Sequence, residues 1–166
     1  MAQTCTSAAT SINSRRLPAI YSRVPYFTGR VVLDWGCGRY TDHIRAALPQ
    51  HLAYLPYDPF NQPEQVNRDT LALVRIALHT HTPMTVICSN VLNVIDNDLE
   101  VGSIAAWIQH IVTQTGGIGY ITVYEGDRSG TGRKTGPDQY QRNAPLREYL
   151  KYFPGARIQS GMIVVR

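Results

Sequence analysis

The stretch Val31-Val32-Leu33-Asp34-Trp35-Gly36-Cys37-Gly38 is the part of the sequence on which the fold prediction depends. An apolar run ends at an acid, two glycines follow with one residue between them, and a polar pair at 41–42 then opens an apolar-periodic segment. This order predicts a buried strand, a tight turn and the start of a helix. Glycines in such a turn let the backbone approach a ligand, because a side chain there would block it. We therefore expect this segment to hold a nucleoside.

The overall composition is ordinary for a globular protein. The chain has 166 residues, of which 43% are hydrophobic and 17% are charged. This length predicts one domain, over residues 14–166, with a sizeable core, while the Ser/Thr/Ala-rich residues 1–13 are expected to be flexible. No apolar run reaches the roughly 18–20 residues of a membrane span, and the N-terminus lacks the apolar core of a secretory signal, so no membrane partner is expected.

Cysteine usage and charge restrict the setting and the partners. The three cysteines, Cys5, Cys37 and Cys88, are odd in number and unpaired in spacing, which predicts a reducing, cytoplasmic setting without a disulfide framework or a metal site. His79 and His81 would point apart at a helix end, whereas a zinc site needs three or four converging ligands. The formal net charge of +4 permits contact with nucleic acid without requiring it.

Strand and helix patterns alternate along the chain. Strands are predicted at 31–35, 51–57, 84–88 and 118–124, and helices at 41–48, 67–79 and 145–153. A further helix is predicted to begin after Asp98 and to end at Gly116-Gly117. Two short strands near 156–159 and 162–165 flank Ser160-Gly161, a two-residue hairpin signal. The alternation predicts an α/β fold of the Rossmann-like kind. We expect a mostly parallel sheet with helices on both faces and an antiparallel C-terminal hairpin.

Residues 125–143 form a long segment that is rich in glycine, charge and polar groups. Loops of this length are usually functional lids or binding loops, or else disordered. The segment contains four cations that are candidates for binding a phosphate-bearing acceptor, with a solvated, mobile loop as the equally weighted alternative. These cations are Arg128, Arg133, Lys134 and Arg142.

In open α/β sheets, ligands bind at the carboxyl ends of the strands where the strand order reverses. The glycine turn, Asp58 and the segment 89–93 all map to that edge. Asp58 follows Asp34 by one strand–helix–strand unit, which places a carboxylate where it can accept two ribose hydroxyls. A turn residue before Pro59 is the simpler alternative for Asp58, and its spacing from the glycines favours the first interpretation.

The glycine pattern also discriminates between cofactors. A nicotinamide-binding fingerprint would be Gly-x-Gly-x-x-Gly, whereas this chain has Thr41 in place of the third glycine. A pyrophosphate would then lose its close approach to the helix start. An acid directly before the glycines suits a cationic or zwitterionic ligand better than a pyrophosphate, which favours S-adenosylmethionine over NAD.

The segment Asp34-Trp35-Gly36-Cys37-Gly38, together with Asp58, resembles the cofactor site of the class I S-adenosylmethionine-dependent methyltransferases. The likeness extends over about residues 31–165. A narrower resemblance, to small bacterial and phage methyltransferases, rests on Ser89-Asn90-Val91-Leu92-Asn93-Val94-Ile95 and on Tyr140-Gln141-Arg142-Asn143, and it does not identify a substrate.

The resemblance implies a set of cofactor contacts. The backbone at the two glycines would pack against the methionine part of S-adenosylmethionine, Asp34 would orient its amino group, and Asp58 would bind the ribose. The segment at Ser89 and Asn90 would pass under the cofactor and face the substrate. The implied cofactor-binding residues are Asp34, Gly36, Cys37, Gly38, Asp58, Ser89 and Asn90, and the substrate-binding candidates are Asn93, Tyr124, Arg128 and Tyr140.

The chain departs from the family pattern in two respects. Between Asp58 and the strand at 84–88 there is room for one helix and hardly for the usual third strand and its helix, so the adenine contact is not assigned. After Cys88 there is no Asn/Asp-Pro-Pro-Tyr/Phe motif of amino-methylating DNA enzymes, and neither Cys37 nor Cys88 has the Pro-Cys context of cytosine C5 enzymes.

The leading hypothesis is therefore a methyltransferase whose acceptor is a small molecule or a nucleic acid. The alternatives are a non-catalytic S-adenosylmethionine-binding module and, more weakly, an NAD-linked oxidoreductase. Methyl transfer from a sulfonium mainly needs alignment of the reactants, so a general base is required only when the acceptor must lose a proton. Glu125, Asp127 and the exposed histidines are candidates for that base, and none is assigned.

Overall fold

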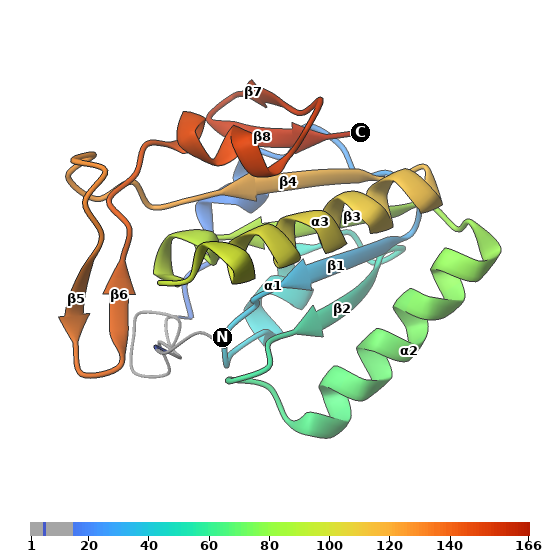
Figure 1. The fold of residues 1–166 in the computed structure, drawn as a ribbon. Helices are drawn as coiled ribbons and strands as arrows, with labels where there is room; N and C mark the ends of the chain where they lie inside the picture. Colours follow the sequence, from blue (N-terminus) through green and yellow to red (C-terminus); the bar gives the residue numbers. More distant parts are fainter. Residues whose placement is uncertain (1–4, 6–14) are drawn as a thin grey trace.

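The central element of the structure, a computed structural model, is a six-stranded sheet with the order β2-β1-β3-β4-β8-β7 (Figure 1). Its strands are β1 (Val31–Trp35), β2 (Ala53–Tyr57), β3 (Met84–Ser89), β4 (Ile118–Thr122), β7 (Arg157–Gln159) and β8 (Met162–Val165). The strands β2, β1, β3 and β4 are parallel, whereas β8 runs antiparallel to both β4 and β7. The predicted mixed α/β sheet with an antiparallel C-terminal hairpin is thus confirmed.

The structure describes residue 5 and residues 15–166. The predicted flexible segment, 1–13, lies outside the described residues apart from Cys5, which is buried. In the described part of the chain, none of the helices has the length and apolar character needed to cross a membrane.

Helices cover both faces of the sheet, as predicted. They are α1 (Asp42–Ala47), α2 (Glu64–Thr80) and α3 (Asp98–Thr115), with the 3-10 helices η2 (Ala19–Ser22), η3 (Leu92–Val94) and η4 (Leu146–Tyr152). One buried cluster joins α2, α3 and η4 to one face of the sheet, and a second joins α1 and η2 to the other. Alternate residues of β1 divide between them, since Leu33 belongs to the first cluster and Val32 to the second.

The position of β1 fixes where a ligand site can form. It pairs with β2 on one side and with β3 on the other, and all three strands are parallel. After β1 the chain passes through α1 to β2, on one side of β1, and then through α2 to β3, on the other side. This is a reversal of strand order at the carboxyl ends of β1 and β3, the place where crevices open in such sheets.

Two predicted helices differ from the observed ones. Helix α2 begins at Glu64, directly after Pro63, and not near Asn67, because the Asn67 side chain is used elsewhere: its Oδ1 accepts from the backbone N–H of Asp58 at 3.0 Å. The predicted helix at 145–153 is the 3-10 helix η4. Its buried residues Leu146 and Tyr149 lie three apart, which matches the three-residue turn of a 3-10 helix.

The segment 125–143 was predicted to lack regular structure, and this was wrong for its second half. It contains a separate two-stranded antiparallel sheet of β5 (Arg133–Gly136) and β6 (Gln139–Gln141), which stands beside the carboxyl ends of the parallel strands (Figure 1). The room between β2 and β3 is taken by α2 alone, and no strand in the described residues pairs with the outer edge of β2.

Candidate functional site

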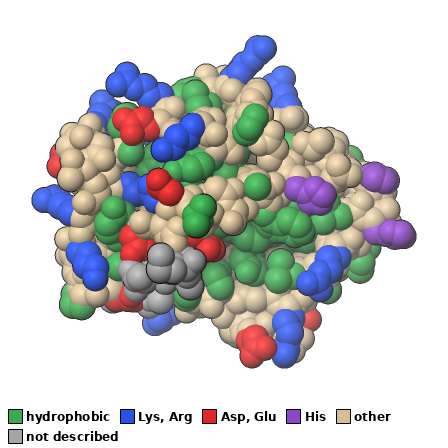
Figure 2. All heavy atoms as spheres, in the orientation of Figure 1, with side chains coloured by type: hydrophobic (Ala, Val, Ile, Leu, Met, Phe, Trp, Pro, Cys, Tyr) green, Lys and Arg blue, Asp and Glu red, His purple; other side chains and the backbone are tan. Residues whose placement is uncertain are grey.

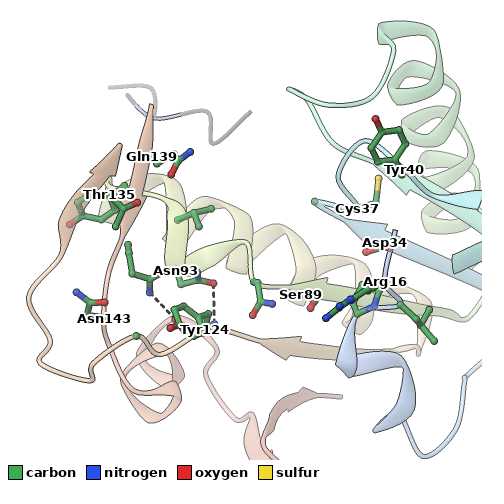
Figure 3. Close-up of a pocket in the computed structure, with 18 of the residues that line it drawn as sticks. Arg16, Asp34, Cys37, Tyr40, Ser89, Asn93, Tyr124, Thr135, Gln139 and Asn143 are labelled. Carbon is green, nitrogen blue, oxygen red and sulfur yellow. Dashed lines mark hydrogen bonds between the residues drawn. The ribbon is translucent and has the colours of Figure 1, made fainter. Parts of the chain in front are cut away.

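A cavity of about 1100 Å³ opens at the carboxyl ends of β1 and β3. The turn after β1 forms one side, the β5–β6 hairpin forms the other, and the segment after β3 lies between them (Figure 3). Most of the residues predicted from the sequence are brought together here. Those on its wall are Asp34, Gly36, Cys37, Ser89, Asn90, Asn93, Tyr124 and Tyr140.

Asp34 is a buried carboxylate on the cavity wall, with 3% of its surface exposed. Its Oδ2 accepts hydrogen bonds from the hydroxyls of Tyr21, at 2.7 Å, and Tyr54, at 2.8 Å. Burial raises the pKa of Asp34 from 3.8 to about 6, against the opposing effect of the two tyrosine hydrogen bonds. Burial and the nearby carboxylate also raise the pKa of both tyrosines, so their hydroxyls stay protonated and donate.

The glycine turn is held by the end of β2 and by its own geometry. The backbone N–H groups of Gly36 and Cys37 both donate to the carbonyl of Tyr57, at 2.7 and 3.2 Å. Gly36 has a φ of +81°, and a Cβ there would lie 2.2 Å from Cγ2 of Val91. Both the turn and its close approach to the segment after β3 therefore require glycine.

Cys37 lies in the turn, and its surroundings disfavour the thiolate. Burial, followed by the charges of Asp34 and Asp58, raises the pKa of its thiol far above the ordinary value, and the thiol donates to the carbonyl of Gly38. A thiol that stays protonated is a poor nucleophile. The contribution of Cys37 to the wall is therefore its backbone and its bulk.

Asp58 and Gly38 do not line the cavity, unlike the other residues of the predicted cofactor set. Asp58 is 5% exposed, and its Oδ1 accepts from the backbone of Phe60 and from the backbone and side chain of Asn61, at 3.0 to 3.1 Å. Its Oδ2 accepts from the Gly38 N–H at 3.0 Å. These contacts match the alternative in which Asp58 is a turn residue. Its carboxylate also stabilises the glycine turn through the bond to Gly38.

The opposite wall is organised by two buried carboxamides. Asn93 Nδ2 donates to Gln141 Oε1 at 3.2 Å, Gln141 Nε2 donates to the carbonyl of Tyr124 at 2.8 Å, and the Tyr124 N–H donates to Asn93 Oδ1 at 3.3 Å. The three bonds close a ring that joins η3, the segment after β4, and β6. Asn93, a substrate-binding candidate, is thus committed to positioning Tyr124 and the hairpin.

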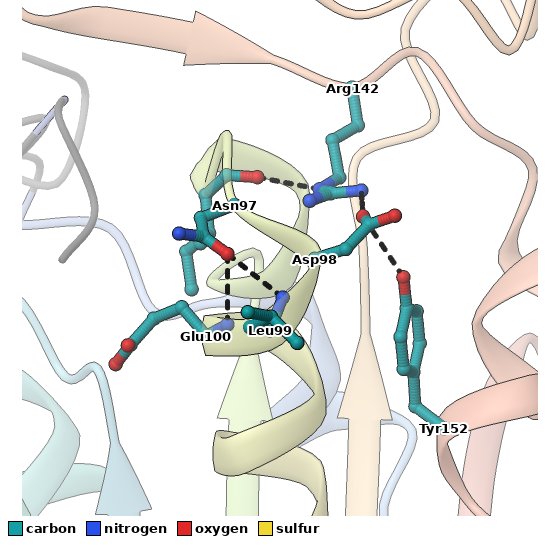
Figure 4. A network of polar contacts seen from close by, with 7 residues as sticks. Asn97, Asp98, Leu99, Glu100, Arg142 and Tyr152 are labelled. Atoms are coloured by element: carbon teal, nitrogen blue, oxygen red, sulfur yellow. Dashed lines mark hydrogen bonds and ion pairs between the residues drawn. The ribbon is translucent and has the colours of Figure 1, made fainter. Parts of the chain in front are cut away.

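Arg142 fastens the hairpin to the start of α3 (Figure 4). Its guanidinium donates to the carbonyl of Ile95 and to Oδ1 of Asp98, both at 2.6 Å, and its backbone N–H donates to the carbonyl of Asn93. The same Asp98 oxygen accepts from the Tyr152 hydroxyl at 3.1 Å. The hydrogen bond from Arg142 lowers the pKa of Asp98. The sequence suggested Arg142 as a phosphate ligand, but its guanidinium is bonded within the protein.

Ser89 and Asn90 connect the two walls at the end of β3. The Ser89 and Thr122 hydroxyls lie 3.2 Å apart, and the Asn90 N–H donates to the Thr122 carbonyl at 2.9 Å. Asn90 has a φ of +57°, a left-handed conformation that asparagine tolerates better than most residues. The bend lies where Ser89 and Asn90 line the cavity.

Several other predicted residues lie elsewhere or are occupied. Arg128 is not on this cavity and lines a second one. Of the candidate bases, Glu125 is bonded to the Leu146 N–H and to Arg128, whereas Asp127 and His43 lie on the wall.

Wall residues that the sequence interpretation missed include Tyr40, Thr135, Gln139 and Gln141. Thr135 and Gln139 had no signal beyond the length of their loop, whereas Gln141 belongs to the segment 140–143 on which the narrower resemblance rests. Residues 16–18, which precede η2, also line the cavity. The Arg15 guanidinium lies 4.7 Å from the centre of the Tyr40 ring.

Within the described residues, no three His, Cys, Asp or Glu side chains are grouped as a metal site would require. Comparison with protein-family models, with curated proteins and with solved structures finds no match for this chain.

Proposed function

We propose that the protein is a methyltransferase that uses S-adenosylmethionine. The observation that carries this proposal is the position of the Asp34 carboxylate, on the cavity wall beside the Gly36 turn, where the strand order reverses. A buried carboxylate of this kind suits a ligand with an ammonium group. The four parallel strands and the reversal at β1 are compatible with a Rossmann-like fold, which is the fold that the sequence resemblance implies.

The residues present fit this cofactor by the chemistry of their groups. Oδ2 of Asp34 is engaged by two tyrosines, while Oδ1 receives no hydrogen bond from the described residues and can accept from the amino group of the methionine part. The backbone at Gly36 and Cys37 would lie against that part, and Ser89 and Asn90 beneath it. Asp58 contributes indirectly, through its hydrogen bond to the turn. When bound, the sulfonium supplies an electrophilic methyl group, and the electrons of the broken carbon–sulfur bond remain on sulfur.

The cavity has a second wall that a module binding only the cofactor would not need. The volume of about 1100 Å³ is near the upper end of the usual range for ligand pockets, roughly 300–1000 Å³. The wall with Tyr124, Tyr140 and Asp127 would contact the acceptor. In-line displacement needs the two reactants aligned in a closed space, which a wall on each side can supply.

Calorimetric titration of the full chain tests the cofactor. We expect S-adenosylmethionine and S-adenosylhomocysteine to bind with one site per chain, and NAD to show no heat above dilution. Binding of NAD alone would exclude the proposal in favour of the oxidoreductase. Tight binding of S-adenosylmethionine without transfer of labelled methyl to any component of a nucleic-acid or metabolite pool would favour the binding module.

A further inference from the structure

A second cavity, of about 1090 Å³, adjoins the first. Tyr124, Gly126 and Asp127 line both cavities, so the segment that follows β4 is the wall between them. The other boundaries of the second cavity are the start of η4 and the turn between β7 and β8. A ligand that extends beyond the first cavity along this wall would enter the second.

Three arginines from separate elements line the second cavity: Arg23 after η2, Arg128 in the loop after β4, and Arg147 in η4. Arg23 and Arg147 are exposed and form no ion pair with any described residue. Figure 2 shows that Lys and Arg side chains gather over the part of the surface formed by η4, β7 and the β5–β6 hairpin.

The acidic groups in the second cavity are Glu125 and Asp127. Glu125 is already neutralised, because its Oε2 lies 2.5 Å from Nε of Arg128 and its Oε1 accepts from the Leu146 N–H at 2.6 Å. The hydrogen bond from Leu146 is the main cause that lowers the pKa of Glu125, so its carboxylate stays ionised and holds the Arg128 guanidinium in place. The charge of Arg147 also lowers the pKa of Glu125, so this arginine lies near that carboxylate. The cavity thus holds three guanidinium groups against the carboxylates of Glu125 and Asp127.

The shared wall carries an exposed aromatic ring. Tyr124 is 64% exposed, although its backbone N–H and carbonyl are both fixed by the buried carboxamides of Asn93 and Gln141. An exposed tyrosine whose backbone is fixed, on a wall shared with cationic groups, is a combination on which nucleobases stack while arginines hold the phosphate.

We infer that the methyl acceptor is a nucleoside phosphate, either a free nucleotide or a unit of a single strand. Its base would lie in the first cavity against Tyr124, with its phosphate in the second cavity beside Arg23 and Arg147. A base inside a duplex would have to leave its stack to enter the first cavity, so we expect an unpaired base to bind more readily. This inference rests on the proposed function and extends it to the class of substrate.

The test compares the double variant Arg23→Gln/Arg147→Gln with Arg75→Gln, an exposed arginine of α2 that lines neither cavity. The probes are a short fluorescein-labelled single-stranded RNA, the DNA of the same sequence, and the four ribonucleoside monophosphates with their unphosphorylated nucleosides. We expect the double variant to bind the tighter probe roughly tenfold or more weakly at about 0.1 M salt. For strand binding, the slope of log affinity against log salt should also fall by about two.

Arg75→Gln is expected to change neither quantity by more than about twofold, as for a surface charge distant from the ligand. Calorimetry with S-adenosylmethionine and thermal melting are run on every variant, and both are expected to match the parent because the two arginines have no ion pair to lose. Strand binding far tighter than nucleotide binding identifies a nucleic acid, and equal binding identifies a free nucleotide.

Three results would overturn the inference: nucleosides binding as tightly as nucleotides, equal losses in the double variant and Arg75→Gln, or binding of S-adenosylmethionine with no binding of any phosphate probe. A protein that bound a strand through these arginines but did not bind S-adenosylmethionine would instead overturn the proposed function.

Discussion

The turn after β1 and the β5–β6 hairpin face each other across the first cavity, and they are held in place by different means. The turn is fixed by backbone hydrogen bonds to Tyr57 and by the contact of Gly36 with Val91. The hairpin belongs to a separate sheet and is fixed by side chains, chiefly Asn93, Gln141 and Arg142, that reach across long stretches of sequence.

This difference indicates that the two walls of the cavity have different roles in the proposed enzyme. A site built from strand ends and tight backbone contacts is rigid and suits an invariant cofactor. A hairpin held by a few polar side chains can change its sequence without disturbing the sheet, which suits the recognition of a particular acceptor. The two walls should therefore respond differently to substitution.

The largest effect is expected from Gly36→Ala in the turn. A Cβ at this position adds a clash with Val91 to the strain of a left-handed backbone, and together these should lower the free energy of unfolding by roughly 3–5 kcal/mol and abolish binding of S-adenosylmethionine. Gly155→Ala is the matched control, because Gly155 has the same φ of +81° with nothing within 4 Å of the added carbon. It should lose only about 1–2 kcal/mol and retain binding. Urea unfolding that gave equal losses would show that the turn is not held by its close contact.

A smaller and more local effect is expected from Asn93→Leu in the hairpin wall. The substitution leaves the Gln141 Oε1 and the Tyr124 N–H without partners, at a cost of roughly 2 kcal/mol. Hydrogen exchange should accelerate in β5 and β6 while the sheet stays protected. Gln109→Leu removes one exposed carboxamide hydrogen bond and serves as the control. Acceleration spread evenly over the sheet would contradict independent walls.

The smallest effect is expected from Arg142→Lys. A lysine cannot bond both the Ile95 carbonyl and Asp98, but Asp98 is 67% exposed, so solvent screens the pair and the loss should be about 1 kcal/mol. Arg68→Lys, in an exposed pair with Glu64, should cost less than that. Faster exchange confined to the hairpin in the Arg142 variant alone would show that Arg142 anchors the hairpin, and identical exchange in the two variants would show that it does not.

The two walls also differ in how far the sequence predicts them. The turn and its strand were predicted because the apolar run, the acid and the glycines are adjacent in the chain, and local geometry then decides the outcome. The hairpin was missed because its strands are short, polar and exposed, so they carry no hydrophobic alternation. Their position depends on Arg142 and Asn93, whose partners cannot be identified from spacing.

Within the predicted site, Asp58 shows what spacing along the chain does not determine. Its spacing from Asp34 correctly placed it at the carboxyl edge of the sheet, yet spacing does not tell in which direction a carboxylate points. The neighbouring N–H groups of Phe60 and Asn61 and that of Gly38 engage it within the protein. The tyrosines that bond Asp34 were missed for a related reason, since they come from η2 and β2 and meet only in the folded chain.

The pH dependence of S-adenosylmethionine binding, measured by calorimetry in the parent and in Asp34→Asn, tests whether Asp34 binds the cofactor. The folded-state pKa of Asp34 is raised, so its carboxylate ionises only as pH rises through about 6. Affinity in the parent should increase through that range and then level off, and Asp34→Asn should bind roughly 10- to 100-fold more weakly at neutral pH with no such step.

The raised pKa also fixes the sign of the effect on stability. The group stabilises the fold when protonated, below its ordinary pKa of 3.8, and that stability is lost as pH rises through about 6, by about 3 kcal/mol in total. Asp34→Asn should therefore unfold no more easily than the parent at neutral pH, which separates lost binding from lost folding. A parent whose affinity is flat through pH 6, or a variant that binds S-adenosylmethionine as tightly as the parent, would contradict the assignment of Asp34 to the cofactor.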